Sequence, residues 1–122
     1  MAVGAYLQTA ASQLRRAAQE SMREAESVRA TLHESEIKTR VEKNSLERQL
    51  RNAQQEERHA ENSDIRHEKA AEVQRLQQEI ANLERQFNDE KAQRLREVDD
   101  KQGKVQELNN EASLLERKAA SI

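Results

Sequence analysis

Apolar residues in the second half of the chain recur at alternating steps of three and four. The stretch VQRLQQEIANLERQF places Val73, Leu76, Ile80, Leu83 and Phe87 at such steps, and mostly charged or amide side chains fill the positions between them. Because an α-helix turns once in about 3.6 residues, this spacing puts the five apolar side chains on one narrow face. The pattern predicts a helix that buries this stripe against a partner helix, as in a coiled coil.

The repeat is not a pure heptad. A second frame, with Val98 and Val105 at equivalent heptad positions, begins eleven residues after Phe87, and Ile65, Leu76, Phe87 and Val98 are all eleven apart. An eleven-residue step locally unwinds the left-handed supercoil of a heptad coiled coil. The sequence therefore predicts an extended coiled coil with mixed seven- and eleven-residue repeats.

Three consecutive helical segments differ in the strength of the stripe. After residues 1–4, which we expect to fray, residues 5–32 are rich in alanine, so their stripe buries little area per residue. Residues 33–71 are highly charged and weakly apolar, and residues 72–122 carry the regular coiled-coil repeat. We interpret the segments as parts of one continuous structural unit.

The predicted oligomer seam combines the stripes of these segments. Its expected role is burial against partner helices, because each member lies on the apolar face of its own segment. The seam comprises Leu7, Leu14, Ala18, Ala25, Val28, Leu32, Leu46, Leu50, Val73, Leu76, Ile80, Leu83, Phe87, Leu95, Val98, Val105, Leu108, Ala112, Leu115 and Ala119.

One stretch offers an alternative all-α fold. The sequence HAENSDIRH contains Asn62, Ser63 and Asp64, which favour helix caps over helix interiors. A turn near residues 60–64 would fold the chain into an antiparallel helical hairpin. Neither glycine nor proline marks this turn, so the sequence favours a single long helix over the hairpin.

The composition argues against a compact globular core. Of the 122 residues, 34% are hydrophobic, 2% are aromatic and 36% are charged, and there is no proline. Aromatic side chains, which dominate the energetics of compact cores, are thus nearly missing, whereas strong helix formers abound. We expect a non-enzymatic structural protein, an elongated coiled-coil subunit that oligomerises into a rod, a filament or a multi-subunit complex.

Candidate chemistry is sparse. Glu56 with His59, and Asp64 with His67, have the three-residue spacing that di-metal helical bundles use. Such bundles need these pairs on separate helices, so we interpret the pairs as solvated charge. The absence of cysteine excludes disulfides and thiol catalysis, and no glycine-rich loop is present to bind phosphate. We expect no catalytic activity, cofactor, metal or small-molecule substrate.

A basic face predicts an alternative function, that of an adapter or tether that recruits an acidic partner. Six residues project within a wedge about 80° wide on a continuous helix. They are Arg40, Arg48, Arg51, Arg58, Arg66 and Lys69. The net charge of −2 and the scarcity of aromatics argue against nucleic acid as the partner. No apolar run approaches the ~20 residues of a membrane span, so we expect a cytoplasmic protein without membrane attachment.

The charges beside the seam bear on its partner. Valine or isoleucine at position a with leucine at d favours a parallel two-stranded coiled coil. In a parallel, in-register homodimer, however, Glu79 would face Glu84 and Glu111 would face Glu116. Like charges at these positions disfavour that pairing. We therefore expect coiled-coil partner helices from a different chain, in a hetero-oligomer, or from a staggered or antiparallel copy.

Overall fold

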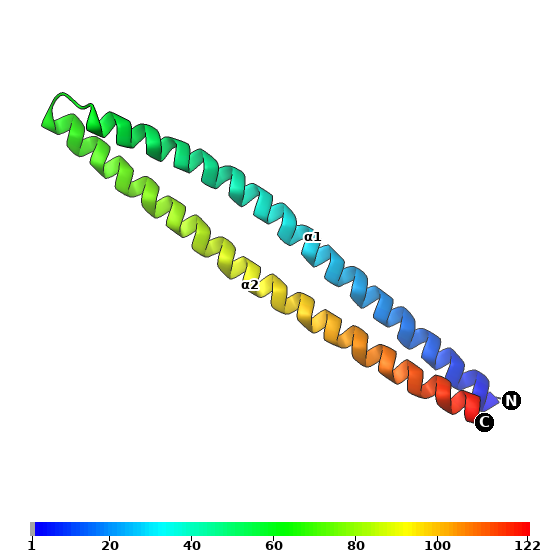
Figure 1. Ribbon diagram of the computed structural model, residues 1–122. Coiled ribbons are helices and arrows are strands. Elements are labelled where there is room, and N and C mark those ends of the chain that lie inside the picture. The colour runs from blue at the N-terminus through cyan, green and yellow to red at the C-terminus, as the bar shows by residue number, and fades with distance from the viewer. Residues whose placement is uncertain (1) are drawn as a thin grey trace. The chain divides into compact units, whose positions relative to one another are not determined.

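The computed structural model describes residues 2–122, which form two long α-helices. Helix α1 spans Ala2–Arg58 and helix α2 spans Ser63–Ser121, and residues 59–62 connect them (Figure 1). The helices pack against each other in antiparallel directions. The all-α prediction is confirmed, and the hairpin alternative fits this arrangement.

The connection corrects the continuous helix that the sequence favoured. The side chain of Asn62 caps α2, because its Oδ1 accepts a hydrogen bond of 2.8 Å from the main-chain N–H of Ile65. The N–H of Arg66 donates to the carbonyl of Asn62 at 3.2 Å, and the Arg66 Nη2 donates to the carbonyl of Ala60 at 3.3 Å. No residue of 2–122 has a positive φ angle. Capping by an asparagine therefore interrupts the helix without the glycine or proline that the sequence argument required.

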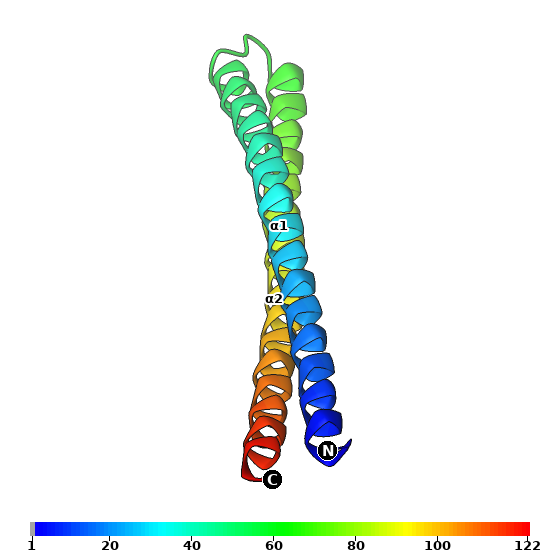
Figure 2. The same cartoon turned by 90° about the vertical axis from the view of Figure 1, so that its right-hand side faces the viewer.

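Contacts between the helices divide the chain into two compact units. The terminal unit joins the chain up to Thr31 with Gln93–Ile122, and the turn unit is Leu32–Ala92. Each unit contains a stretch of α1 packed on a stretch of α2, and Figure 2 shows the pairing of the helices from a second direction. The three segments of the sequence analysis divide the chain by composition, whereas these units divide it by contacts.

Small side chains form the core of the terminal unit. Ala11, Ala18 and Ala25 recur at intervals of seven on α1 and are 2% exposed, and Val98 and Ala112 of α2 are similarly buried. Alanine brings little apolar area to a core but lets two helices approach closely. The alanine-rich segment therefore pairs through close contact of the helix backbones more than through large apolar side chains.

The turn unit has a core of larger residues. Ala53, Val73 and Leu76 are buried, and Leu46 and Leu50 pack against them. Leu76 is fully buried, and among residues 2–122 it is the only large side chain of which this is true. The stretch whose stripe was most regular in the sequence thus contributes the best-buried side chain.

Burial along α2 follows the eleven-residue step, but with different residues from those expected. Phe87, Glu90 and Arg94 are half-buried and Val98 is buried, which gives steps of three, four and four. Leu95 is 43% exposed and lies outside this series. A glutamate and an arginine therefore occupy the inward positions where the apolar pattern had indicated a leucine.

The buried face changes phase across the turn. In α1 it includes Leu50 and Ala53, and the same heptad continued along the chain would reach positions 71 and 74. Helix α2 uses Val73 and Leu76 instead, two residues later. Two residues turn a coiled-coil face by about 200°. One uninterrupted helix would therefore carry the two faces on nearly opposite sides, and the turn allows them to meet.

Candidate functional site

The candidate site is the pairing strip, which we define as the buried and half-buried positions of α1 and α2 that face the other helix. Nineteen of the twenty predicted seam residues lie in it, and Leu95 does not. The buried members are Ala18, Ala25, Val73, Leu76, Val98 and Ala112. The half-buried members are Leu7, Leu14, Val28, Leu32, Leu46, Leu50, Ile80, Leu83, Phe87, Val105, Leu108, Leu115 and Ala119.

Three buried residues are not among the predicted seam residues, although two of them, Ala11 and Ala53, lie on the apolar stripes of the sequence. Ala11 lies seven residues before Ala18, and Ala53 lies seven residues after Leu46, so both continue the heptad spacing of the seam. Ser21 is 4% exposed, and its Oγ donates a hydrogen bond of 3.1 Å to the carbonyl of Lys101. A buried hydroxyl needs such a partner, which only the opposite helix could reveal.

Three lysines of the pairing strip, the strip lysines, also lie outside the predicted seam, although the sequence had placed Lys69 on the basic face. Each reaches a glutamate on the opposite helix, and the side chains of the lysines are between 26% and 37% exposed. The pairs are Lys43 Nζ with Glu84 Oε1 at 2.6 Å, Lys101 Nζ with Glu24 Oε2 at 2.8 Å, and Lys69 with Glu56. The strip therefore contains lysines as well as apolar side chains, and each of these lysines pairs with an exposed glutamate beside the strip.

These contacts shift the protonation equilibria of the groups involved. In each strip lysine, the hydrogen bond to the glutamate of the opposite helix is the largest cause, and it raises the lysine pKa above its ordinary value. The hydrogen bond from Lys101 and then its charge lower the pKa of Glu24. In the Lys101–Glu24 pair, the contact therefore favours the charged form of both side chains.

The partners in these ion pairs follow one another in the order of an antiparallel pairing. In the ion pairs of the strip lysines, the α1 members are acidic, basic and acidic in chain order, and the α2 members are basic, acidic and basic. As the residue number rises on α1, that of the partner on α2 falls. The sets in chain order are Glu24, Lys43 and Glu56 on α1, and Lys69, Glu84 and Lys101 on α2.

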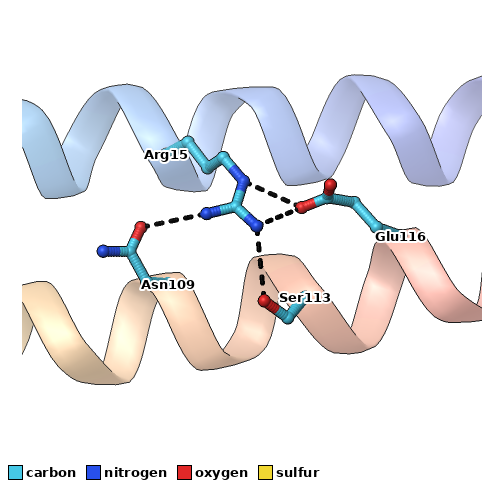
Figure 3. Close-up of polar contacts among 4 residues, drawn as sticks. All are labelled: Arg15, Asn109, Ser113 and Glu116. Carbon is cyan, nitrogen blue, oxygen red and sulfur yellow. Dashed lines mark hydrogen bonds and ion pairs between the residues drawn. The ribbon is translucent and has the colours of Figure 1, made fainter.

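An arginine links the helices beside the strip in the terminal unit (Figure 3). The Arg15 Nε donates to Glu116 Oε1 at 2.8 Å, its Nη1 donates to Asn109 Oδ1 at 3.4 Å, and its Nη2 donates to Ser113 Oγ at 3.3 Å. The planar guanidinium suits such a fan of acceptors. Arg15 and Glu116 are almost half exposed, so this bridge adds geometric specificity with little stability.

The six predicted basic-face residues do not share one helix, since the turn places the first four on α1 and the last two on α2. Lys69 belongs to the pairing strip, Arg66 donates to the carbonyl of Ala60, and Arg40 pairs with Glu36 at 3.3 Å. The exposed members that form no ion pair within residues 2–122 are Arg48, Arg51, Arg58 and Arg66, and the first three also donate no side-chain hydrogen bond there.

The two candidate metal pairs have other contacts. Glu56 pairs with Lys69, and the Nδ1 of His67 lies 2.7 Å from the carbonyl oxygen of Ser63. Nowhere in residues 2–122 do three or more histidine, cysteine, aspartate or glutamate side chains gather as metal ligands would. Over the same residues, neither helix has a stretch apolar enough to cross a bilayer.

Comparison with known proteins adds no relative. No protein-family model matches the chain, no curated protein matches its sequence, and no solved structure matches it. Any functional conclusion must therefore come from the pairing strip and the charges around it.

Proposed function

We propose that the chain is a non-enzymatic structural protein, an elongated coiled-coil subunit that assembles through its pairing strip into a larger complex. The observation that carries this proposal is the width of the apolar strip. Thirteen of the predicted seam residues are only half-buried by the pairing of α1 with α2. Two helices thus leave part of the apolar strip accessible, and further helices would remove it from water.

The sizes of the side chains support the same proposal. The terminal unit is paired mainly by alanines, each of which adds little apolar burial. A pair of helices with so small a core gains stability when further chains associate, because association adds apolar contacts that one chain lacks. Assembly would therefore supply burial that the isolated chain does not have.

Sedimentation equilibrium over a wide range of chain concentrations tests this function. We expect the wild-type chain to associate, and the double variant Leu76→Glu, Leu83→Glu to lose association because it places charge in the strip. The matched control is Leu95→Glu with Leu114→Glu, two exposed leucines of the same helix. A wild-type chain that remains monomeric at every concentration would refute the proposal.

A second function is favoured by the exposed arginines Arg48, Arg51 and Arg58, which have no acidic partner within residues 2–122. As an adapter or tether, the chain would bind an acidic partner through them. Such binding should weaken with salt and with Arg51→Glu, Arg58→Glu. Binding that is insensitive to both changes would remove this alternative.

A further inference from the structure

We infer that the outward side of α1 in the turn unit is a second helix-binding surface, which accepts an amphipathic acidic helix from another protein. The inference rests on the adapter function proposed above, which assigns an acidic partner to three arginines of this side. It adds the class of the partner and the apolar contacts that would select it. The surface, which we call the outer strip, comprises Ile37, Val41, Asn44, Arg48, Arg51, Gln55 and Arg58.

The outer strip has the spacing of a coiled-coil seam. Its members follow one another at steps of four and three, and all of them are exposed. In the same stretch, buried and half-buried positions of the pairing strip form a separate series at these steps. That series is Thr39, Lys43, Leu46, Leu50, Ala53 and Glu57. A second helix can therefore lie along the outer strip, over roughly 30 Å, while α1 stays paired with α2.

The side chains that would bind this helix have no partner in the described part of the chain. Ile37 is 46% exposed and Val41 is 65% exposed. Among residues 2–122, Arg48, Arg51 and Arg58 form no ion pair, and their guanidinium groups donate no hydrogen bond. The outer strip thus offers apolar side chains at its first two positions and unpaired positive charge along the rest.

The outer strip contains no acidic residue, although glutamate is frequent in α1. The glutamates of residues 37–58 all lie at other positions, namely Glu42, Glu47, Glu56 and Glu57. The terminal unit differs, because its exposed Arg16 and Arg23 each lie one helical turn from Glu20. Opposite charges thus alternate on α1 in the terminal unit, whereas the outer strip carries one sign of charge. That single sign is complementary to an acidic partner.

A helix suits the outer strip better than a nucleic acid or a membrane. A partner helix presents side chains at the same steps, so its carboxylates can meet the arginines while its apolar residues cover Ile37 and Val41. A phosphate backbone has no contact to offer these two side chains, and the outer strip has no aromatic residue on which a base could stack. A helix on a membrane surface needs an apolar face along its whole length, which the outer strip does not provide.

Two synthetic test peptides probe the docking on the full chain. Each is a helix of about 22 residues, the length of the outer strip, built from alanine and glutamine. One face carries two leucines and then three glutamates at steps of three and four. The leucines are N-terminal in one test peptide and C-terminal in the other, which covers both directions of the partner. A control peptide of the same composition has its leucines and glutamates distributed around the helix.

Fluorescence anisotropy of the labelled peptides gives their dissociation constants. We expect at least one test peptide to bind roughly tenfold more tightly than the control peptide, because only the test peptides place carboxylates and leucines on one face. A single-stranded DNA oligonucleotide and vesicles of phosphatidylcholine with phosphatidylserine represent the other two partner classes. Both should bind more weakly than that test peptide.

Two variants of the chain separate the contributions of charge and apolar contact. The arginine variant, Arg48→Gln, Arg51→Gln and Arg58→Gln, should weaken binding of the test peptide roughly tenfold or more. The apolar variant, Ile37→Gln and Val41→Gln, should weaken it about fivefold.

A control variant matches the change in net charge at exposed arginines of the same helix in the terminal unit. It carries Arg16→Gln, Arg23→Gln and Arg29→Gln, and it should weaken binding by less than about twofold. All the substituted positions are exposed and lie outside the pairing strip. Circular dichroism should therefore show the helix content of the wild type in every variant, and sedimentation equilibrium should show its association.

The outcomes separate this inference from the adapter function. Loss of binding in both the arginine variant and the apolar variant, with retention in the control variant, supports the helix-binding surface. If only the apolar variant binds as the wild type does, or if the control peptide binds as tightly as the test peptides, the inference is refuted while the adapter function stands. Tighter, arginine-dependent binding of the DNA or the vesicles also refutes the inference. If no probe binds in a way that depends on these arginines, both are wrong.

Discussion

Replacing Leu76 with alanine gives the sharpest test of the core of the turn unit. Leu76 is 0% exposed and packs in a cluster with Ala53, Val73, Leu46 and Leu50. Removing a buried leucine side chain typically costs 2–5 kcal/mol, depending on how far the site collapses. The strip is narrow and bordered by solvent, which favours collapse, so we expect about 2–3 kcal/mol. Helix propensity changes little, because alanine and leucine are both good helix formers.

The expected loss corresponds to a melting temperature lowered by roughly 6–15 °C for a chain of this length. Circular dichroism during heating and urea denaturation would measure it, and hydrogen exchange would locate it. We expect faster exchange of backbone amides within Leu32–Ala92 than in the terminal unit, since Leu76 packs entirely within the turn unit.

The matched control is Leu95→Ala, which removes the same atoms from the same helix at a position that is 43% exposed. A surface substitution of this kind should change the free energy of unfolding by no more than about 0.5 kcal/mol. If Leu76→Ala and Leu95→Ala lowered stability equally, the assignment of Leu76 to a buried interface between the helices would be wrong.

Three further substitutions or titrations address the turn, the helix interior and the strip lysines. Asn62→Ala should lower the free energy of unfolding by about 1 kcal/mol, because the variant loses the cap of α2. The control Asn52→Ala, at an exposed position within α1, should not lower it. Equal effects of the two substitutions in urea denaturation would contradict the role of Asn62 as a cap. Gly103→Ala should raise the free energy of unfolding by about 0.5–1 kcal/mol, because alanine favours the helix and the added Cβ meets nothing within 4 Å. The control Gly4→Ala, near the terminus, should have less effect. A destabilised Gly103→Ala variant would show that the helix is strained at this position. Since the pKa values of the strip lysines are raised on folding, their stabilisation is present below the ordinary value near 10.5 and is lost as the pH rises through the raised values. Changing the three strip lysines to arginine should preserve the melting temperature at high pH, and the same change at the exposed residues Lys38, Lys91 and Lys118 should not. Equal pH profiles of the two variants would show that the strip lysines are not the cause.

The sequence was sufficient to predict helical structure and the residues that form most of the buried face, but it favoured one continuous helix over two. Steps of three and four identify a helical stripe, and α2 buries Val73 and Leu76 as that stripe indicated. The turn was less accessible to prediction. The residues that favour a cap, beginning at Asn62, were recognised in the sequence. Whether one cap is enough to end a helix without glycine or proline depends on the stability gained when the two helices pair, which the local sequence does not show.

The charged members of the strip could not be predicted from the pattern alone. A pattern search for apolar residues at inward positions does not select lysines. Lys101 and Lys43 can nevertheless lie at such positions, because each pairs with a glutamate of the opposite helix. That glutamate is more than forty residues away in the sequence. Leu95 illustrates the converse, an apolar residue that faces outward because Arg94 takes its place in the eleven-residue step.

The two-residue change of phase between Ala53 and Val73 would determine how the chain binds its neighbours if the turn became helical. A straightened chain would present its two strips on nearly opposite sides, so one neighbour could not cover both. Each chain would then have to bind two different neighbours, and such binding would continue from copy to copy without a natural end. The cap at Asn62 stabilises the start of α2 and so favours the break between the helices over such a straightened chain.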